Sequence, residues 1–200
     1  MALARIASAG QSRRHQVGND TMKQAVFLDR DGVINREVFR TGQAQAPFAL
    51  EDLDVLPGVP NALDRLRHAG FMLVVVTNQP DVVRGLASKH HVEAINAYLR
   101  QMLPLDDIRV CYHDDAERCA CRKPSPGMLY AAAVQHDIAL ANSYLVGDRW
   151  RDVGAGRSAG CTTILVHSDR DEPTTIEPHV RRRDLAEAAS WILEHTKNTR

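Results

Sequence analysis

Two carboxylates that could act on a phosphate ester follow the first apolar run of the chain. Residues 25–28 are typical of a buried parallel strand, and they lead directly into Asp29, Arg30, Asp31 and Gly32. Ligands in an open α/β sheet lie beyond the carboxyl ends of such strands. There, two carboxylates one residue apart could hold a hard cation, or one could attack phosphorus while the other handles the proton. A solvated acidic turn is the alternative interpretation.

Later apolar runs are followed by further groups that suit a phosphate. Thr77, Asn78 and Gln79 come at the end of the second run, where a hydroxyl and two amides could surround phosphate oxygens. Lys123 lies in a stiff, proline-flanked segment, and its compact ammonium suits a phosphate. Asp148 follows another apolar run. Taken singly, Thr77-Asn78-Gln79 could be a turn and Lys123 a surface charge. Asp148 could be the N-cap of a helix, although Asp152 is the better candidate for that cap.

The elements that must position these groups alternate along the chain. We predict strands over residues 25–28, 71–76, 108–112, 144–146 and 162–166. We predict five helices. The first opens at Pro57-Gly58 and stops at Gly70, and the second starts at Ser88 as a cap and runs to 103. The others cover 126–136, 151–159 and 185–193. Strand–helix alternation predicts an α/β fold, with a mainly parallel sheet of about five strands between helices. Residues 36–56 look irregular, and no insertion is long enough for a large cap domain.

Three of the four cysteines form a constellation with one histidine. Cys111, His113, Cys119 and Cys121 could supply three thiolates and an imidazole, a closed tetrahedral set typical of structural zinc. Disulfides are the competing interpretation, although two cysteines separated by one residue are poorly placed to bridge. Cys161 lies apart from this set, immediately before the strand predicted over residues 162–166, and we expect it to be a free, buried thiol.

Length and charge set the remaining bounds. Two hundred residues suit one domain, for which we expect residues 23–195, with a flexible tail at 1–22 and another at 196–200. The 25 basic and 25 acidic residues balance, which gives no electrostatic reason to expect nucleic acid or a membrane as partner. The leader has no apolar segment of secretory type, so we expect a cytoplasmic protein. We also expect a monomer.

The order of the dispersed groups resembles the haloacid dehalogenase (HAD) superfamily of phosphoryl-transfer enzymes. The matching positions are Asp29 with Asp31, then Thr77, Lys123 and Asp148. The resemblance implies a three-layer, Rossmann-like fold and hydrolysis through an aspartyl-phosphate on Asp29, with Asp31 as general acid and base. It also implies Mg²⁺ held by Asp29, Asp148 and the backbone carbonyl of Asp31, with Thr77 and Lys123 on the phosphate oxygens.

The cysteine pattern resembles one branch of that superfamily. Its cysteine pair, Cys119 and Cys121, runs directly into Arg122-Lys123-Pro124, as in the D-glycero-D-manno-heptose-1,7-bisphosphate 7-phosphatases and the histidinol phosphatases. The resemblance implies zinc that holds the Arg-Lys loop, removal of the 7-phosphate of a heptose bisphosphate, and a role for Asp152 in orienting the Asp148 loop. It also implies that substrate is contacted by Glu37, Arg40, Asn78, Gln79, Arg122 and Arg149.

Two alternatives to a heptose phosphatase stay open. Pro80-Asp81 stands where the heptose enzymes typically have Ser-Gly, so histidinol phosphate or another small ester remains a candidate substrate. The other alternative is a zinc-stapled binding domain without turnover. The presence of both Asp29 and Asp31 argues against it, since a binding module needs no acid–base carboxylate.

Overall fold

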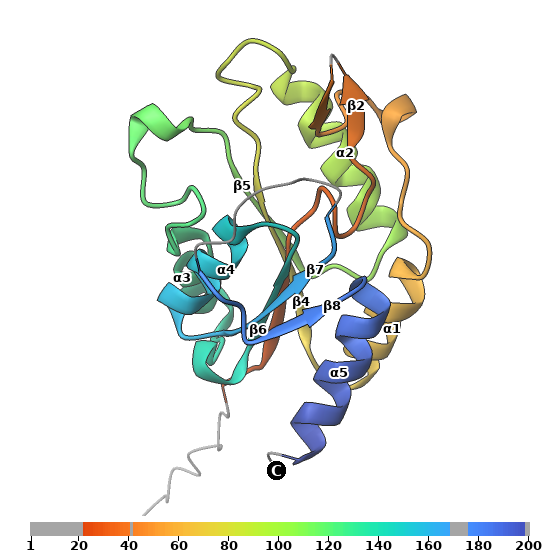
Figure 1. Cartoon of the computed structure of the whole chain (residues 1–200), viewed down its shortest axis with the longest axis vertical. Coiled ribbons are helices and arrows are strands. Elements are labelled where there is room, and N and C mark those ends of the chain that lie inside the picture. Colours follow the sequence, from red (N-terminus) through yellow and green to blue (C-terminus); the bar gives the residue numbers. More distant parts are fainter. Residues whose placement is uncertain (1–21, 41, 169–175, 199–200) are drawn as a thin grey trace, which may run out of the picture.

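The fold is built around a parallel six-stranded sheet (Figure 1). The computed structural model describes residues 22–40, 42–168 and 176–198, so the expected N-terminal tail lies, apart from Met22, outside the described residues. The strand order is β5 (Asp107–Cys111), β4 (Met72–Asn78), β1 (Ala25–Leu28), β6 (Tyr144–Gly147), β7 (Thr162–Val166) and β8 (Val180–Arg182). Every neighbouring pair in the sheet is parallel.

Helices cover both faces of this sheet and make three layers. α1 (Val59–His68), α2 (Lys89–Met102) and α5 (Leu185–Asn198) pack on one face; α3 (Gly127–His136) and α4 (Trp150–Ala159) pack on the other. Val26 and Leu28 enter the first core, while Ala25 and Phe27 enter the second. Burial on both faces explains why β1 is apolar at every position. The α/β class and the mainly parallel sheet are confirmed.

Three local features differ in detail from the expectation. The segment expected to be irregular contains an antiparallel hairpin, β2 (Val38–Arg40) and β3 (Gln43–Gln45), followed by the 3-10 turn η1 (Leu50–Asp52). The sheet has a sixth strand, β8, because a three-residue edge strand with two arginines carries almost no apolar pattern. Ser88 is the N-cap of α2, as expected, but its side chain makes no capping hydrogen bond.

The last helix is longer than expected. It runs to Asn198, so residues 196–198 are helical where a frayed tail was expected. Thr196 donates a hydrogen bond to the Ile192 carbonyl and contacts the Tyr144 hydroxyl at 3.0 Å, which ties this end to the sheet.

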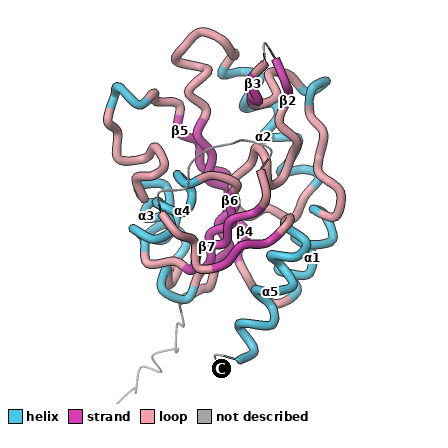
Figure 2. Tube along the Cα trace, viewed as in Figure 1, coloured by secondary structure: helices cyan, strands magenta, loops and turns pink. Residues whose placement is uncertain are grey.

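The carboxyl ends of the parallel strands meet at one edge of the sheet. Figure 2 shows long loops and the β2–β3 hairpin gathered at the end of the molecule opposite the C-terminus. The segment between β1 and α1 supplies only the hairpin, η1 and their connections, not a separate cap domain. Among the described residues, no helix is long and apolar enough to cross a membrane.

Candidate active site

Three buried carboxylates meet at the carboxyl edge of the sheet; we call them the acidic cluster. Asp29 follows β1, Asp148 follows β6, and Asp152 lies in the first turn of α4. One oxygen from each lies within 4.8 Å of the others. The adjacent parallel strands β1 and β6 bring the first two together, although 119 positions separate them in the sequence. The sequence placed both aspartates at this edge, and the structure brings them into one site.

Lys123 is the cation of this cluster. Its ammonium lies 2.9 Å from Asp29 and 2.5 Å from Asp152, and its side chain is only 2% exposed. Asn78, at the end of β4, fixes the lysine's backbone, because its amide donates to the Lys123 carbonyl and its oxygen accepts from the Lys123 N–H, both at 3.1 Å. The sequence predicted Lys123 as a residue of the site, but it did not predict the contact between Lys123 and Asp152.

Asp152 is not the cap that its position suggested. Arg149 is the N-cap of α4, and Asp152 accepts the Arg149 N–H at 3.1 Å from the third helical position. Its other oxygen binds Lys123. Asp152 thereby ties the loop that carries Asp148 to the lysine.

The crowding of charge shifts the pKa values of these groups. The pKa of Asp29 is raised to about 7, first by burial and then by Asp152, against the opposing effect of Lys123. Burial, with Asp29 and Asp152, likewise raises the pKa of Asp148 well above its usual value. Burial alone would lower the pKa of Lys123, but Asp152 and Asp29 raise it, so the lysine stays charged. One ammonium therefore does not suffice to keep all three carboxyls of the acidic cluster ionised.

The acidic cluster fits a hard divalent cation. Asp148 Oδ1 is buried and accepts no hydrogen bond from any described residue, an arrangement that is costly unless something else satisfies the oxygen. Both Asp152 oxygens are already engaged, which leaves Asp29 and Asp148 as side-chain ligands of the kind Mg²⁺ prefers. Gly32, at φ +85°, provides the space that the Asp148 carboxylate occupies, because a Cβ there would lie 2.3 Å from Asp148 Oδ2.

Asp31 lies beside the acidic cluster but in its own network. Its carboxylate accepts from Arg30 at 3.0–3.1 Å, from Asn35 at 3.0 Å and from Gln79 at 2.7 Å. Gln79 also donates to the Thr77 hydroxyl at 2.8 Å. Thr77 and Gln79 are both buried, and only Gln79 and Asp31 of this group line the cleft described next.

A cleft of about 280 Å³ opens above these groups. Of the residues expected to contact substrate, five line it: Glu37, Asn78, Gln79, Arg122 and Arg149. Arg40 does not; it binds Asp52 and the Ala46 carbonyl and lies over the Phe48 ring at 4.2 Å. Arg40 instead braces the hairpin.

Two arginines that the site prediction missed also line the cleft. These are Arg84 and Arg151, which face it together with Asp115. Arg84 makes a two-point contact with Asp114 at 2.8 and 2.6 Å, and Arg151 lies 3.5 Å from Asp115. Both arginines follow the end of a strand within a few residues, and this position was the only feature of the sequence that could have indicated them as site residues.

The four zinc-type residues converge as expected; we call them the Cys/His cluster. The three sulfurs lie 3.3–3.7 Å apart, and His113 Nδ1 lies 3.3 and 3.6 Å from two of them. Tetrahedral zinc with Zn–S near 2.3 Å would place its sulfurs about 3.8 Å apart and sulfur and nitrogen about 3.5 Å apart. The cluster is therefore a slightly contracted tetrahedron that a zinc ion could fill. Cys161 lies apart and buried, as predicted.

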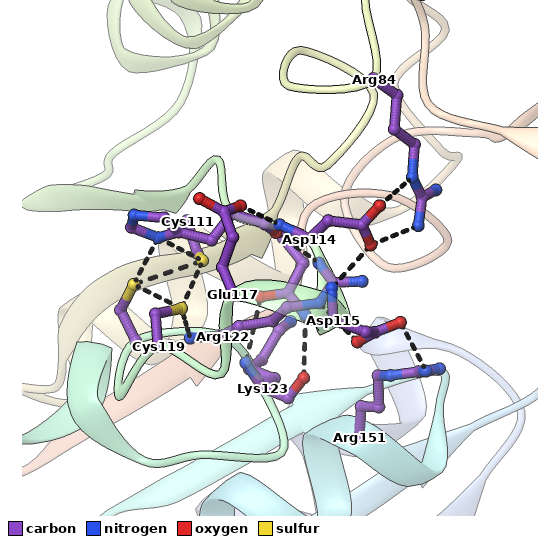
Figure 3. A network of polar contacts seen from close by, with 12 residues as sticks. Arg84, Cys111, Asp114, Asp115, Glu117, Cys119, Arg122, Lys123 and Arg151 are labelled. Atoms are coloured by element: carbon purple, nitrogen blue, oxygen red, sulfur yellow. Dashed lines mark hydrogen bonds and ion pairs between the residues drawn. The ribbon is translucent and has the colours of Figure 1, made fainter.

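The Cys/His cluster connects directly to the cleft (Figure 3). Cys119 Sγ accepts the Arg122 N–H at 3.3 Å, and the Arg122 guanidinium donates to the His113 carbonyl at 3.2 Å and to Asp115 at 2.7 Å. Arg122 is thus fixed at both its backbone and its side chain. The loop that carries Arg122 and Lys123 is held by the same residues that could hold zinc.

The sheet order, the strand-end carboxylates and the buried lysine define the HAD-like hydrolase class. The family model described as HAD-hydrolase-like matches residues 120–189. The solved structure of the D,D-heptose 1,7-bisphosphate phosphatase from B. bronchiseptica, complexed with magnesium and phosphate, is similar with a TM-score of 0.72 and 33% identity. That similarity covers 86% of this chain and 99% of the other. A HAD-like phosphatase from Mesorhizobium loti gives a TM-score of 0.70 at 28% identity, over 86% of each chain.

Curated relatives identify the family more closely. The D-glycero-D-manno-heptose-1,7-bisphosphate 7-phosphatase of Thermosynechococcus vestitus is 36% identical over 196 residues, which cover 86% of this chain and 97% of the relative. The corresponding enzyme of Helicobacter pylori strain J99 is 33% identical over 86% of this chain and 98% of the relative. The chain belongs to the family of the D-glycero-D-manno-heptose-1,7-bisphosphate 7-phosphatases.

Proposed function

We propose that this protein hydrolyses the 7-phosphate of a D-glycero-D-manno-heptose 1,7-bisphosphate. The observation that carries the proposal is the buried Lys123 between Asp29 and Asp152 at the base of an arginine-lined cleft. The names of the relatives support the sugar, and the magnesium and phosphate in the Bordetella structure's title support the chemistry.

Asp29 is the proposed nucleophile. Its carboxylate attacks phosphorus, the bond from phosphorus to the sugar oxygen breaks, and Asp31 gives that oxygen a proton. Water then attacks the aspartyl-phosphate while Asp31 takes a proton back. Lys123 neutralises phosphate charge in a loose transition state, where positioning and electrostatics dominate. Gln79 bridges Thr77 and Asp31, so it is placed to orient the acid–base group.

Two metals fit the described residues. Mg²⁺ would be held by Asp29, Asp148 and the Asp31 carbonyl, and it would supply positive charge beside the phosphate. Zinc would be held by the Cys/His cluster in a closed, structural site. There it would keep Arg122 and Lys123 in place, because Arg122 donates hydrogen bonds to Cys119 Sγ and to the His113 carbonyl.

The arginines of the cleft suit a second anionic group. Arg84, Arg122, Arg149 and Arg151 line it, and planar guanidinium groups bind phosphate at two points. Without a separate cap domain, the cleft admits a small ester from solvent. A bisphosphate offers one phosphate to Lys123 and another to the arginines.

Steady-state kinetics on a panel of esters tests the proposal. Purified protein with Mg²⁺ should give a higher kcat/KM on the heptose 1,7-bisphosphate than on histidinol phosphate, a hexose 6-phosphate or a heptose 7-phosphate. Asp29→Asn should abolish turnover, and Asp31→Asn should lower it by about 10²–10⁴-fold. A preference for histidinol phosphate would show that this ester is the substrate instead. Undiminished turnover in Asp29→Asn would show that Asp29 is not the nucleophile.

A further inference from the structure

A polar residue lies on the buried face of helix α2. The face carries Val92, Ile95 and Leu99, and Asn96 lies among them at 5% exposure. Its Nδ2 has no hydrogen-bond partner among the described residues. Asparagine is a poor helix former, and a buried amide with an unmet donor destabilises the fold. An apolar residue would pack this face better, so Asn96 calls for an explanation other than packing.

The amide oxygen of Asn96 binds Arg30, the one wholly buried arginine among the residues that the structure describes. It accepts from Arg30 Nη1 at 3.0 Å, and the Arg30 side chain is 0% exposed. The rest of the guanidinium contacts Asp31: Nε and Nη2 lie 3.1 and 3.0 Å from Oδ1, and Nη2 lies 3.1 Å from Oδ2. A chain of contacts therefore runs from α2 through Asn96 and Arg30 to the Asp31 carboxylate.

Arg30 approaches Asp31 from the protein interior. Gln79, which also binds this carboxylate, lines the cleft, whereas Arg30 does not line it. The planar guanidinium is fixed on one edge by Asn96 and grips the carboxylate with the other, which sets its direction as well as its position. Truncating the asparagine would remove the fixed edge and leave the bidentate grip free to turn.

We propose that Asn96 and Arg30 are positioning residues that hold Asp31 for hydrolysis of the aspartyl-phosphate, an inference that rests on the proposed function. In that step a water oxygen bonds to phosphorus, and the bond between phosphorus and the Asp29 oxygen breaks. The water proton goes to the Asp31 carboxylate. The products are inorganic phosphate and the Asp29 carboxylate. Misplacing a reacting group by about 1 Å can cost about 10²-fold in rate.

The step can be isolated with p-nitrophenyl phosphate, whose leaving group departs without a proton. Formation of the aspartyl-phosphate then needs no help from Asp31, but its hydrolysis still does. In Asn96→Leu we expect kcat to fall by about 10–100-fold while the initial burst of p-nitrophenol persists. Acid quenching with ³²P-labelled p-nitrophenyl phosphate should show that phosphoenzyme accumulates at steady state. Arg30→Lys, which keeps the charge but loses the two-edged grip, should give the same pattern.

Matched variants separate positioning from general damage to α2. Ile95→Val alters the same buried face without removing the hydrogen bond to Arg30 and should leave the phosphoenzyme level at that of the wild type. Asn96→Asp keeps an acceptor of the same shape and should restore most of the turnover lost in Asn96→Leu. Normal turnover in both Asn96→Leu and Arg30→Lys would overturn the proposal. So would a parallel loss of burst and turnover without accumulation. A wild type that forms no phosphoenzyme would instead refute the proposed function itself.

Discussion

Replacing Lys123 with methionine removes the one cation that is buried among the acidic cluster. The ammonium contacts two carboxylates, and these side chains are 11% and 1% exposed, so water cannot replace it. Breaking a buried ion pair by removing one partner costs about 3–5 kcal/mol. For a chain of this length, each kcal/mol lowers Tm by about 2–4 °C, so we expect Lys123→Met to lower Tm by about 6–20 °C in EDTA.

The stability lost in Lys123→Met should increase with pH. Burial raises the pKa of Asp29 to about 7, and Lys123 holds that pKa down. Without the lysine, the carboxyl takes up a proton more readily in the folded state, which relieves the unbalanced charge. The destabilisation should therefore be larger at pH 8 than at pH 5.

Urea unfolding followed by circular dichroism measures this loss at both pH values. Lys23→Met is the matched control, because Lys23 is exposed and should change the free energy of unfolding by less than about 0.5 kcal/mol. Saturating Mg²⁺ should restore part of the loss in Lys123→Met, since the cation replaces some of the missing positive charge. A loss below about 1 kcal/mol in EDTA at pH 8 would refute the claim that Lys123 is the counter-ion of the acidic cluster.

The remaining predictions concern the metals and the backbone around them. Gly32→Ala should abolish Mg²⁺-dependent turnover, because its Cβ would strike Asp148. Gly70 has a similar positive φ but open space around it, so Gly70→Ala should lower only the stability. Kinetics and thermal unfolding of both variants test this difference. Elemental analysis should find one zinc per chain in the wild type and much less in Cys119→Ser, whose kcat should also fall; full zinc content in the variant would exclude the site. Since burial raises the pKa of Asp29 to about 7, the folded protein binds more protons than the unfolded one between about pH 4 and 7. Stability in EDTA should therefore fall as pH rises through that range, and the stabilisation by Mg²⁺ should grow; calorimetry showing the opposite trend would contradict this.

Sequence patterns predicted the parts of the site that follow from strand ends. Asp29 and Asp148 each come directly after an apolar run, and neighbouring parallel strands bring such residues together. The Cys/His cluster was predictable because its ligands lie close in sequence. These features depend on local pattern and on one rule of sheet topology.

Contacts between distant elements could not be predicted in the same way. The bond from Asp152 to Lys123 depends on how α4 packs beside the loop after the Cys/His cluster, and the bond from Asn96 to Arg30 joins residues 66 positions apart. Arg40 was expected to contact substrate because of the resemblance to the heptose enzymes, yet the hairpin turns it toward Asp52. Short edge elements such as β8 also lack a period long enough to detect.

The most direct test of the account follows both phosphates of one substrate. ³¹P NMR of D-glycero-β-D-manno-heptose 1,7-bisphosphate with the protein and Mg²⁺ should show the 7-phosphate signal replaced by inorganic phosphate while the 1-phosphate signal stays. EDTA or Asp29→Asn should stop the change. Loss of the 1-phosphate, or hydrolysis at an unchanged rate in Asp29→Asn, would contradict it.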